Sequence, residues 1–131
     1  MLFKKEIQIS PEEAVEKLKE NAIGYGFIVR EVFDMAEEFS RHTNVSDDIV
    51  FYSVMLCNPK KAYASIAAKK ERGALLLQPK QVTVYSQDGK TYVGYYSVEK
   101  DAVAEAYPDD LEFQDGLMSS CGKIMDLVDN I

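Results

Sequence analysis

The chain has 131 residues, of which 47% are apolar and 28% are charged, and its formal net charge at pH 7 is −7. Disorder requires low hydrophobicity together with high charge, so this composition predicts a folded globular domain. The acidic balance opposes binding to nucleic-acid phosphates and to anionic membranes. The two cysteines form neither a disulfide framework nor a zinc signature. We therefore expect a single soluble domain over residues 1–131, without metal, cofactor, nucleic-acid or membrane partners.

The N-terminal residues lack the features of a signal peptide, because Phe3 is followed at once by charged residues. No apolar run approaches the length that is needed to cross a bilayer. Both observations favour the reducing cytoplasm as the location of the protein.

Residues 3–9 alternate weakly between apolar and polar side chains and predict a first strand. Ser10 and Pro11 predict the start of a helix, with Ser10 as the N-cap and Glu13 completing a capping box. We expect Gly24 to end this helix in the left-handed conformation.

Aromatic and β-branched residues predict a second strand within residues 25–33. Asp34 is placed to cap a short helix over residues 35–42, and a polar loop follows over residues 43–48. Residues 49–57 are almost all apolar, which predicts a central strand that is buried on both faces.

Asn58 and Pro59 predict the N-cap and first turn of a further helix, which we expect Gly73 to end. Residues 74–86 predict a strand that is interrupted near Pro79, because proline cannot donate to the hydrogen-bond ladder.

Asp88 and Gly89 are typical of a tight hairpin turn, and residues 91–98 predict the returning strand. Residues 100–107 predict a short helix that Pro108 breaks. From Asp109 onward, apolar residues follow a helical spacing that indicates a long amphipathic helix with Cys121 on its buried side. The order of elements predicts an α+β two-layer sandwich, with a mostly antiparallel sheet and helices packed on one face.

Two stretches, GFIVREVFD at residues 26–34 and LCNPKKAYASIAAKKERGALLLQPKQVTVYSQDGK at residues 56–90, resemble the domain-of-unknown-function 302 family. The resemblance covers roughly residues 20 to 96. It implies a small α+β fold related in topology to the TATA-binding-protein fold, usually as a homodimer, and it implies no established activity. The family often has Leu-Pro-Cys after the central helix, whereas Lys80 occupies the cysteine position here. This departure argues against any family role that needs a second thiol near Cys57, such as a metal pair or a redox disulfide.

Cys57 is the first candidate for chemistry, because it ends the predicted central strand just before a helix N-terminus. Free amides and the helix dipole favour a thiolate at such a position. The alternative is that Cys57 is a small apolar filler of the core, and the sequence identifies no general base beside it.

Asn58, Lys60 and Lys61 occupy the start of the same predicted helix, where cations oppose the helix dipole. Amides and ammonium groups at this corner suit a carboxylate or phosphate, and Lys80 would strengthen the site if it lies nearby. The alternative is a solvated surface. His42 is interpreted as exposed, and the acidic residues Asp47, Asp48, Asp109, Asp110 and Glu112 are interpreted as caps or solubilising charge.

On the returning strand, Tyr92 and Tyr96 share one face and Tyr95 lies on the other. They suit a dimer surface if this strand lies near a sheet edge, since tyrosine is enriched at interfaces, and the alternative is ordinary sheet packing. The sequence thus favours a non-enzymatic dimeric module that binds a small anionic or apolar ligand at Cys57, Asn58, Lys60, Lys61 and Lys80. The alternatives are a thiol-dependent or metal-assisted enzyme that uses Cys57, and a nucleic-acid-binding domain that rests on fold analogy alone.

Overall fold

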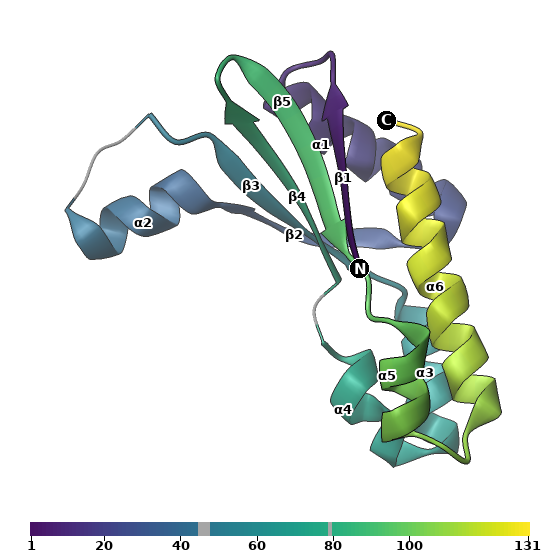
Figure 1. The fold of residues 1–131 in the computed structure, drawn as a ribbon. Coiled ribbons are helices and arrows are strands. Elements are labelled where there is room, and N and C mark those ends of the chain that lie inside the picture. Colours follow the sequence, from purple (N-terminus) through teal and green to yellow (C-terminus); the bar gives the residue numbers. More distant parts are fainter. Residues whose placement is uncertain (45–47, 79) are drawn as a thin grey trace.

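The computed structural model describes residues 1–44, 48–78 and 80–131. Five strands form one sheet in the order β1-β5-β4-β3-β2, and every neighbouring pair is antiparallel (Figure 1). The strands are β1 (Leu2–Ile7), β2 (Ile28–Asp34), β3 (Phe51–Cys57), β4 (Lys80–Gln87) and β5 (Lys90–Tyr96). The predicted α+β class with an antiparallel sheet is confirmed.

Helices cover one face of this sheet and also lie at both of its ends (Figure 1). They are α1 (Pro11–Ala22), α2 (Met35–Thr43), α3 (Pro59–Ala68), α4 (Gly73–Leu76), α5 (Lys100–Ala106) and α6 (Leu111–Asp129), with 3₁₀ turns η1 (Ile23–Tyr25) and η2 (Lys70–Arg72). Figure 1 shows α1 and α6 lying along the sheet, whereas α3, α4 and α5 gather beyond one end of it. The chain therefore has a covered sheet face and a separate helical end.

The main core lies between the sheet and the pair α1 and α6. Side chains from alternate positions of β3, β4 and β5 meet apolar residues of both helices there. The fully buried members include Leu18, Val54, Val84, Ile124 and Leu127. A second, smaller cluster around Val103, Phe113 and Leu117 joins α5 to α6.

The predicted helix starts are confirmed by hydrogen bonds. The side chains of Ser10, Asp34, Asn58 and Asp110 each accept a backbone N–H from three residues further along the chain. The hairpin between β4 and β5 is also confirmed, since Asp88 and Gly89 both have positive φ angles, of 53° and 75°.

Strand β3 is central, as predicted, because β2 and β4 flank it. The prediction that both of its faces are buried is only partly right. Ser53, Val54 and Leu56 are buried, but Phe51 and Met55 are half-buried. The sheet face opposite α1 and α6 therefore remains partly open along this strand.

Three predictions about boundaries are wrong. Residues 74–77 were expected in a strand, but Gly73–Leu76 form α4 and Leu77 follows as a turn. Gly73 has a right-handed φ of −59° and does not end α3, which stops at Ala68. Gly26, with φ 88°, provides the left-handed turn that was assigned to Gly24. The predicted interruption at Pro79 and part of the loop 43–48 lie outside the described residues.

Candidate functional site

The register of the sheet brings the predicted site residues together at the end of β3. Cys57 pairs with Ile28 at the start of β2, and Leu56 pairs with Lys80 at the start of β4. Asn58 then caps α3 through a 3.2 Å hydrogen bond from the Lys61 amide. Residues more than twenty positions apart in sequence therefore share one corner of the fold.

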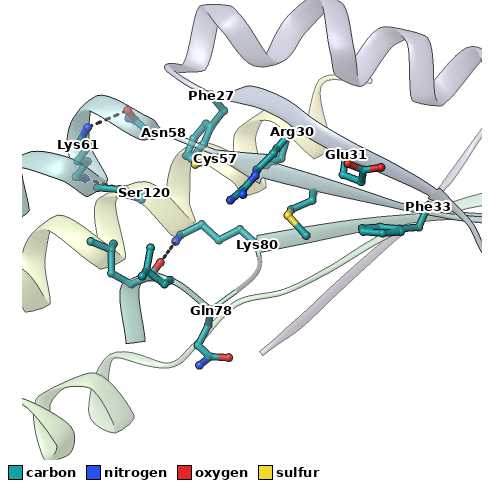
Figure 2. A pocket seen from close by; sticks show the side chains of 15 residues that line it. Phe27, Arg30, Glu31, Phe33, Cys57, Asn58, Lys61, Gln78, Lys80 and Ser120 are labelled. Atoms are coloured by element: carbon teal, nitrogen blue, oxygen red, sulfur yellow. Dashed lines mark hydrogen bonds between the residues drawn. The ribbon is translucent and has the colours of Figure 1, made fainter. Parts of the chain in front are cut away.

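A cavity of about 330 Å³, here called the main cavity, lies at this corner. Cys57, Asn58, Lys61 and Lys80 line it, and Figure 2 shows Arg30 and Lys80 extending into the space beside Cys57. A cavity of this size is at the lower end of the range for small-molecule sites.

Lys61 spans the gap from α3 to α6. Its ammonium group donates to the Gly116 carbonyl and to the Ser120 hydroxyl, each at 2.7 Å. Burial lowers the pKa of Lys61, and the nearby cations Lys123 and Lys80 lower it further. The side chain thus fixes α3 to α6.

Lys80 is half-buried at the start of β4, and its ammonium group donates to the Leu76 carbonyl of α4 at 3.1 Å. Burial lowers the pKa of Lys80, and the neighbouring thiols Cys121 and Cys57 act in the opposite direction. Lys80 is therefore a desolvated cation that lies close to both cysteines.

Among the described residues, neither lysine has a carboxylate within ion-pair distance. Glu31 also lines the main cavity, but Figure 2 shows it further along β2, beyond Arg30. Two neighbouring cations in an acidic chain are thus left without a counter-ion, which costs free energy unless an anion binds.

The two cysteines have different environments. Cys57 is half-buried and lines the main cavity, whereas Cys121 is buried on α6, as the helical spacing predicts. Burial and a hydrogen bond with Cys121 raise the pKa of Tyr95. Of the two cysteines, only Cys57 both lines the main cavity and lies at the end of a strand.

Two further candidates lie apart from this corner. Lys60 is exposed and is not among the residues that line the described cavities. His42 is exposed on α2, as expected from its polar surroundings. Within the described ranges, no three His, Cys, Asp or Glu side chains gather as a metal site. No helix in the same ranges is long and apolar enough to cross a bilayer.

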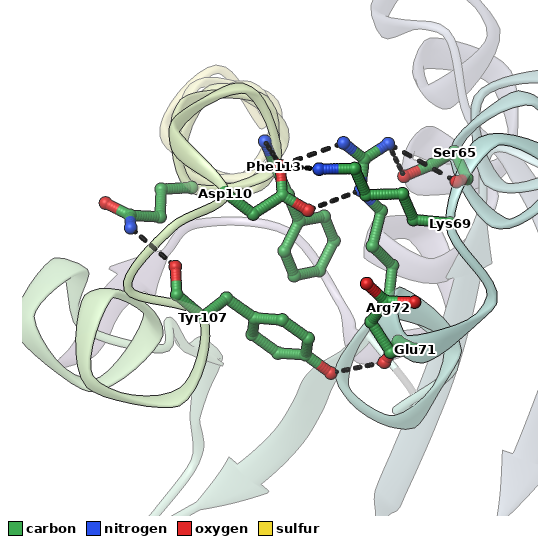
Figure 3. A network of polar contacts seen from close by, with 8 residues as sticks. Ser65, Lys69, Glu71, Arg72, Tyr107, Asp110 and Phe113 are labelled. Carbon is green, nitrogen blue, oxygen red and sulfur yellow. Dashed lines mark hydrogen bonds and ion pairs between the residues drawn. The ribbon is translucent and has the colours of Figure 1, made fainter.

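A buried ion pair that the sequence did not reveal holds the helical end together (Figure 3). Arg72 is 3% exposed and Asp110 is 8% exposed. The guanidinium donates from Nε at 2.7 Å and from Nη2 at 2.9 Å to the two carboxylate oxygens of Asp110. This bidentate pair joins η2 to the start of α6.

Neighbouring contacts extend the same network. Arg72 also donates to the Ser65 carbonyl at 3.3 Å, and the Tyr107 hydroxyl donates to the Glu71 carbonyl at 2.7 Å. The hydrogen bonds from Arg72 hold the pKa of Asp110 at about 2. Because α4 follows Arg72 directly, the network positions the α4 wall of the main cavity.

Fold and cavity together define an α+β domain with an antiparallel sheet and a cation-lined cavity at one sheet end. The chain belongs to the family described as "Domain of unknown function DUF302", whose family model matches residues 3–120. This match extends beyond the stretch on which the resemblance in the sequence rests.

A solved structure supports the same fold. The crystal structure of an uncharacterized conserved DUF302 protein from Bacillus stearothermophilus has a TM-score of 0.77 and 18% sequence identity. The comparison covers 98% of this chain and 95% of that one. The comparison with curated proteins gives no match. The similarities therefore establish family and fold.

Proposed function

We propose that this protein is a non-enzymatic module that binds a small anion in the main cavity. The observation that carries the proposal is the pair Lys61 and Lys80, which line one cavity with no carboxylate partner among the described residues. An ammonium group has three donors. Lys61 uses two of them on α6 and Lys80 uses one on α4. The remaining donors suit an anion with several oxygen atoms.

Thermal unfolding in the presence of phosphate, acetate and other anions tests this proposal. A ligand at a hundred times its Kd stabilises the native state by about 2.7 kcal/mol. We expect phosphate or acetate to raise the Tm of the natural chain, and Lys80→Met to abolish the increase. Lys60→Met removes an exposed lysine outside the cavity and is the matched control. An equal increase in all three proteins would disprove the assignment to this cavity.

A second candidate function is a thiol-dependent reaction at Cys57. It is favoured by Lys80, which lines the same cavity as Cys57. A lysine in this position is able to stabilise a thiolate or exchange a proton with it. Rapid alkylation of Cys57 that persists down to about pH 6 would favour this function over binding alone.

The proposal includes a homodimer, for which the open sheet face is the surface we assign. Phe51, Tyr85 and Tyr92 stack across this face with centroid separations of 5.3 and 5.5 Å. Leu2, on the neighbouring edge strand, is 65% exposed. Apolar and aromatic side chains at an open face are typical of protein interfaces.

Sedimentation velocity tests the dimer. We expect the natural chain to sediment as a dimer and Leu2→Glu to shift it toward the monomer, because a buried unpaired charge disfavours association. Leu111→Glu changes a leucine of similar exposure, 68%, on α6 and should leave the dimer intact. A natural chain that is monomeric at every concentration would disprove this part of the proposal.

A further inference from the structure

Helix α4 and the two residues after it lie among three cavities rather than one. Besides the main cavity, a cavity of about 220 Å³ lies between α3 and α6, and another of about 170 Å³ lies beside β5. We call the latter the β5 cavity. Leu76 lines the first two cavities, and Leu75 lines the β5 cavity. Helix α4 has no buried residue of its own.

Lys80 lies at the boundary between the main cavity and the β5 cavity, because it lines both of them. The rest of the β5 cavity is mainly apolar or aromatic, with walls from Leu75, Tyr95, Val98 and Leu117. None of the residues that line it is acidic. The cavity between α3 and α6 differs in this respect, because Glu112 lines it.

The two cavities differ in charge. The main cavity holds the lysine pair and Arg30 among apolar residues such as Met55 and Leu77, whereas the β5 cavity has mainly apolar walls and no cation besides Lys80. Binding free energy for an apolar group comes from removing its surface from water, which these walls permit. A small inorganic anion would use only the cationic part.

We propose that the ligand of this site is an amphiphilic carboxylate, with its head group at Lys61 and Lys80 and its hydrocarbon chain beneath α4 in the β5 cavity. This inference rests on the proposed function and specifies its ligand class. The head group can bind without breaking an existing hydrogen bond, because Lys80 donates to the Leu76 carbonyl through only one of its three N–H groups. The hydrocarbon chain of the ligand extends from Lys80 into the β5 cavity.

Calorimetric titration with acetate, hexanoate, octanoate and decanoate tests the inference, with decanol as an uncharged control and each amphiphile kept below its micelle-forming concentration. We expect affinity to rise about fourfold for each methylene that is buried, until the cavity is filled. Decanoate should bind more tightly than decanol, because the lysine pair contributes only to the charged ligand.

Two substitutions on α4 locate the chain. Leu75→Phe reduces the volume of the β5 cavity and leaves both lysines in place. It should therefore lower the affinity for decanoate and leave the affinity for acetate unchanged. Ala74→Phe introduces a larger side chain at the exposed neighbouring position, which lines none of the described cavities. This variant should change the affinity for neither ligand. The chain-length series on the natural protein remains decisive if Leu75→Phe does not fold.

The outcomes separate the two proposals. If acetate binds at the Lys80 site but affinity does not rise with chain length, the amphiphile inference is wrong and the anion proposal stands. If decanol binds as tightly as decanoate, the lysine pair is not the head-group site and the inference is wrong. If no anion binds, both proposals are wrong.

Discussion

At the scale of single residues, the site depends on where each side chain lies relative to the cavity. The sequence predicts Lys60 and Lys61 as an equivalent pair, although adjacent residues of a helix differ by about 100° in direction. Tertiary packing distinguishes them: Lys61 reaches α6, whereas Lys60 is exposed. The sequence predicted a role for Lys80 only if it lies near Cys57, because local spacing does not determine the strand register that brings the two residues together.

The two cysteines give a prediction at the same scale. Cys57 lines the main cavity and Cys121 is 3% exposed, so a maleimide should label Cys57 in the native protein and Cys121 only after unfolding. Mass spectrometry of tryptic peptides measures both rates. Decanoate should slow the labelling of Cys57, because its head group lies in the same cavity as this thiol. Equal rates in the native protein would contradict the assigned environments.

Asp110 gives a prediction about acid stability. Its pKa is about 2 in the folded protein against an ordinary value of 3.8, so the unfolded chain binds the proton first. The stabilisation by Asp110 is complete above pH 3.8 and is lost as the pH falls from there to about 2. Urea unfolding measured across this range should show the loss.

The variant Asp110→Asn should have a smaller pH dependence over the same range and a lower stability at pH 7, because Arg72 is left buried without a counter-ion. Asp109→Asn, at the exposed neighbouring residue, is the matched control and should keep both the pH dependence and the neutral stability. An unchanged acid profile in Asp110→Asn would show that the pair does not cause the effect.

At the scale of elements, capping by Asn58 determines where α3 begins and where Cys57 and Lys61 lie. Its side chain accepts the Lys61 amide at 3.2 Å. Asn58→Ala should therefore cost about 1 kcal/mol of stability, whereas Asn58→Ser keeps an acceptor and should cost much less. Chemical unfolding measures the difference. Equal losses in the two variants would show that the cap is not the cause.

The start and class of most elements could be predicted because the signals are local. Ser10, Asp34 and Asn58 are caps, and Asp88 with Gly89 forms a hairpin turn, as their sequence contexts indicate. Residues 74–77 were predicted wrongly, since a run of four apolar residues has no periodicity that separates strand from helix. The contact that decides the local geometry is long-range: Arg72 is paired with Asp110, 38 residues away.

At the scale of the whole molecule, the net charge of −7 is distributed so that one cavity remains cationic. The sequence shows the negative net charge but does not show the cationic cavity. The cations of the cavity come from β2, α3 and β4, and they meet only in the folded chain. The acidic surface repels anions at long range, whereas the cations of the cavity attract them. Salt screens both effects, so a higher ionic strength should weaken anion binding only modestly. Affinity for acetate at low and at high ionic strength measures this effect.

The central claim is that the lysine pair at the end of the sheet forms the anion-binding part of a single ligand site. A titration of isotope-labelled protein with decanoate, followed by backbone amide NMR, tests it most directly. We predict that the largest shift changes lie around Cys57, Lys61, Leu75 and Lys80, and that Lys80→Met abolishes them. Shift changes confined to the surroundings of Phe51, Tyr85 and Tyr92, or equal changes in Lys80→Met, would contradict the claim.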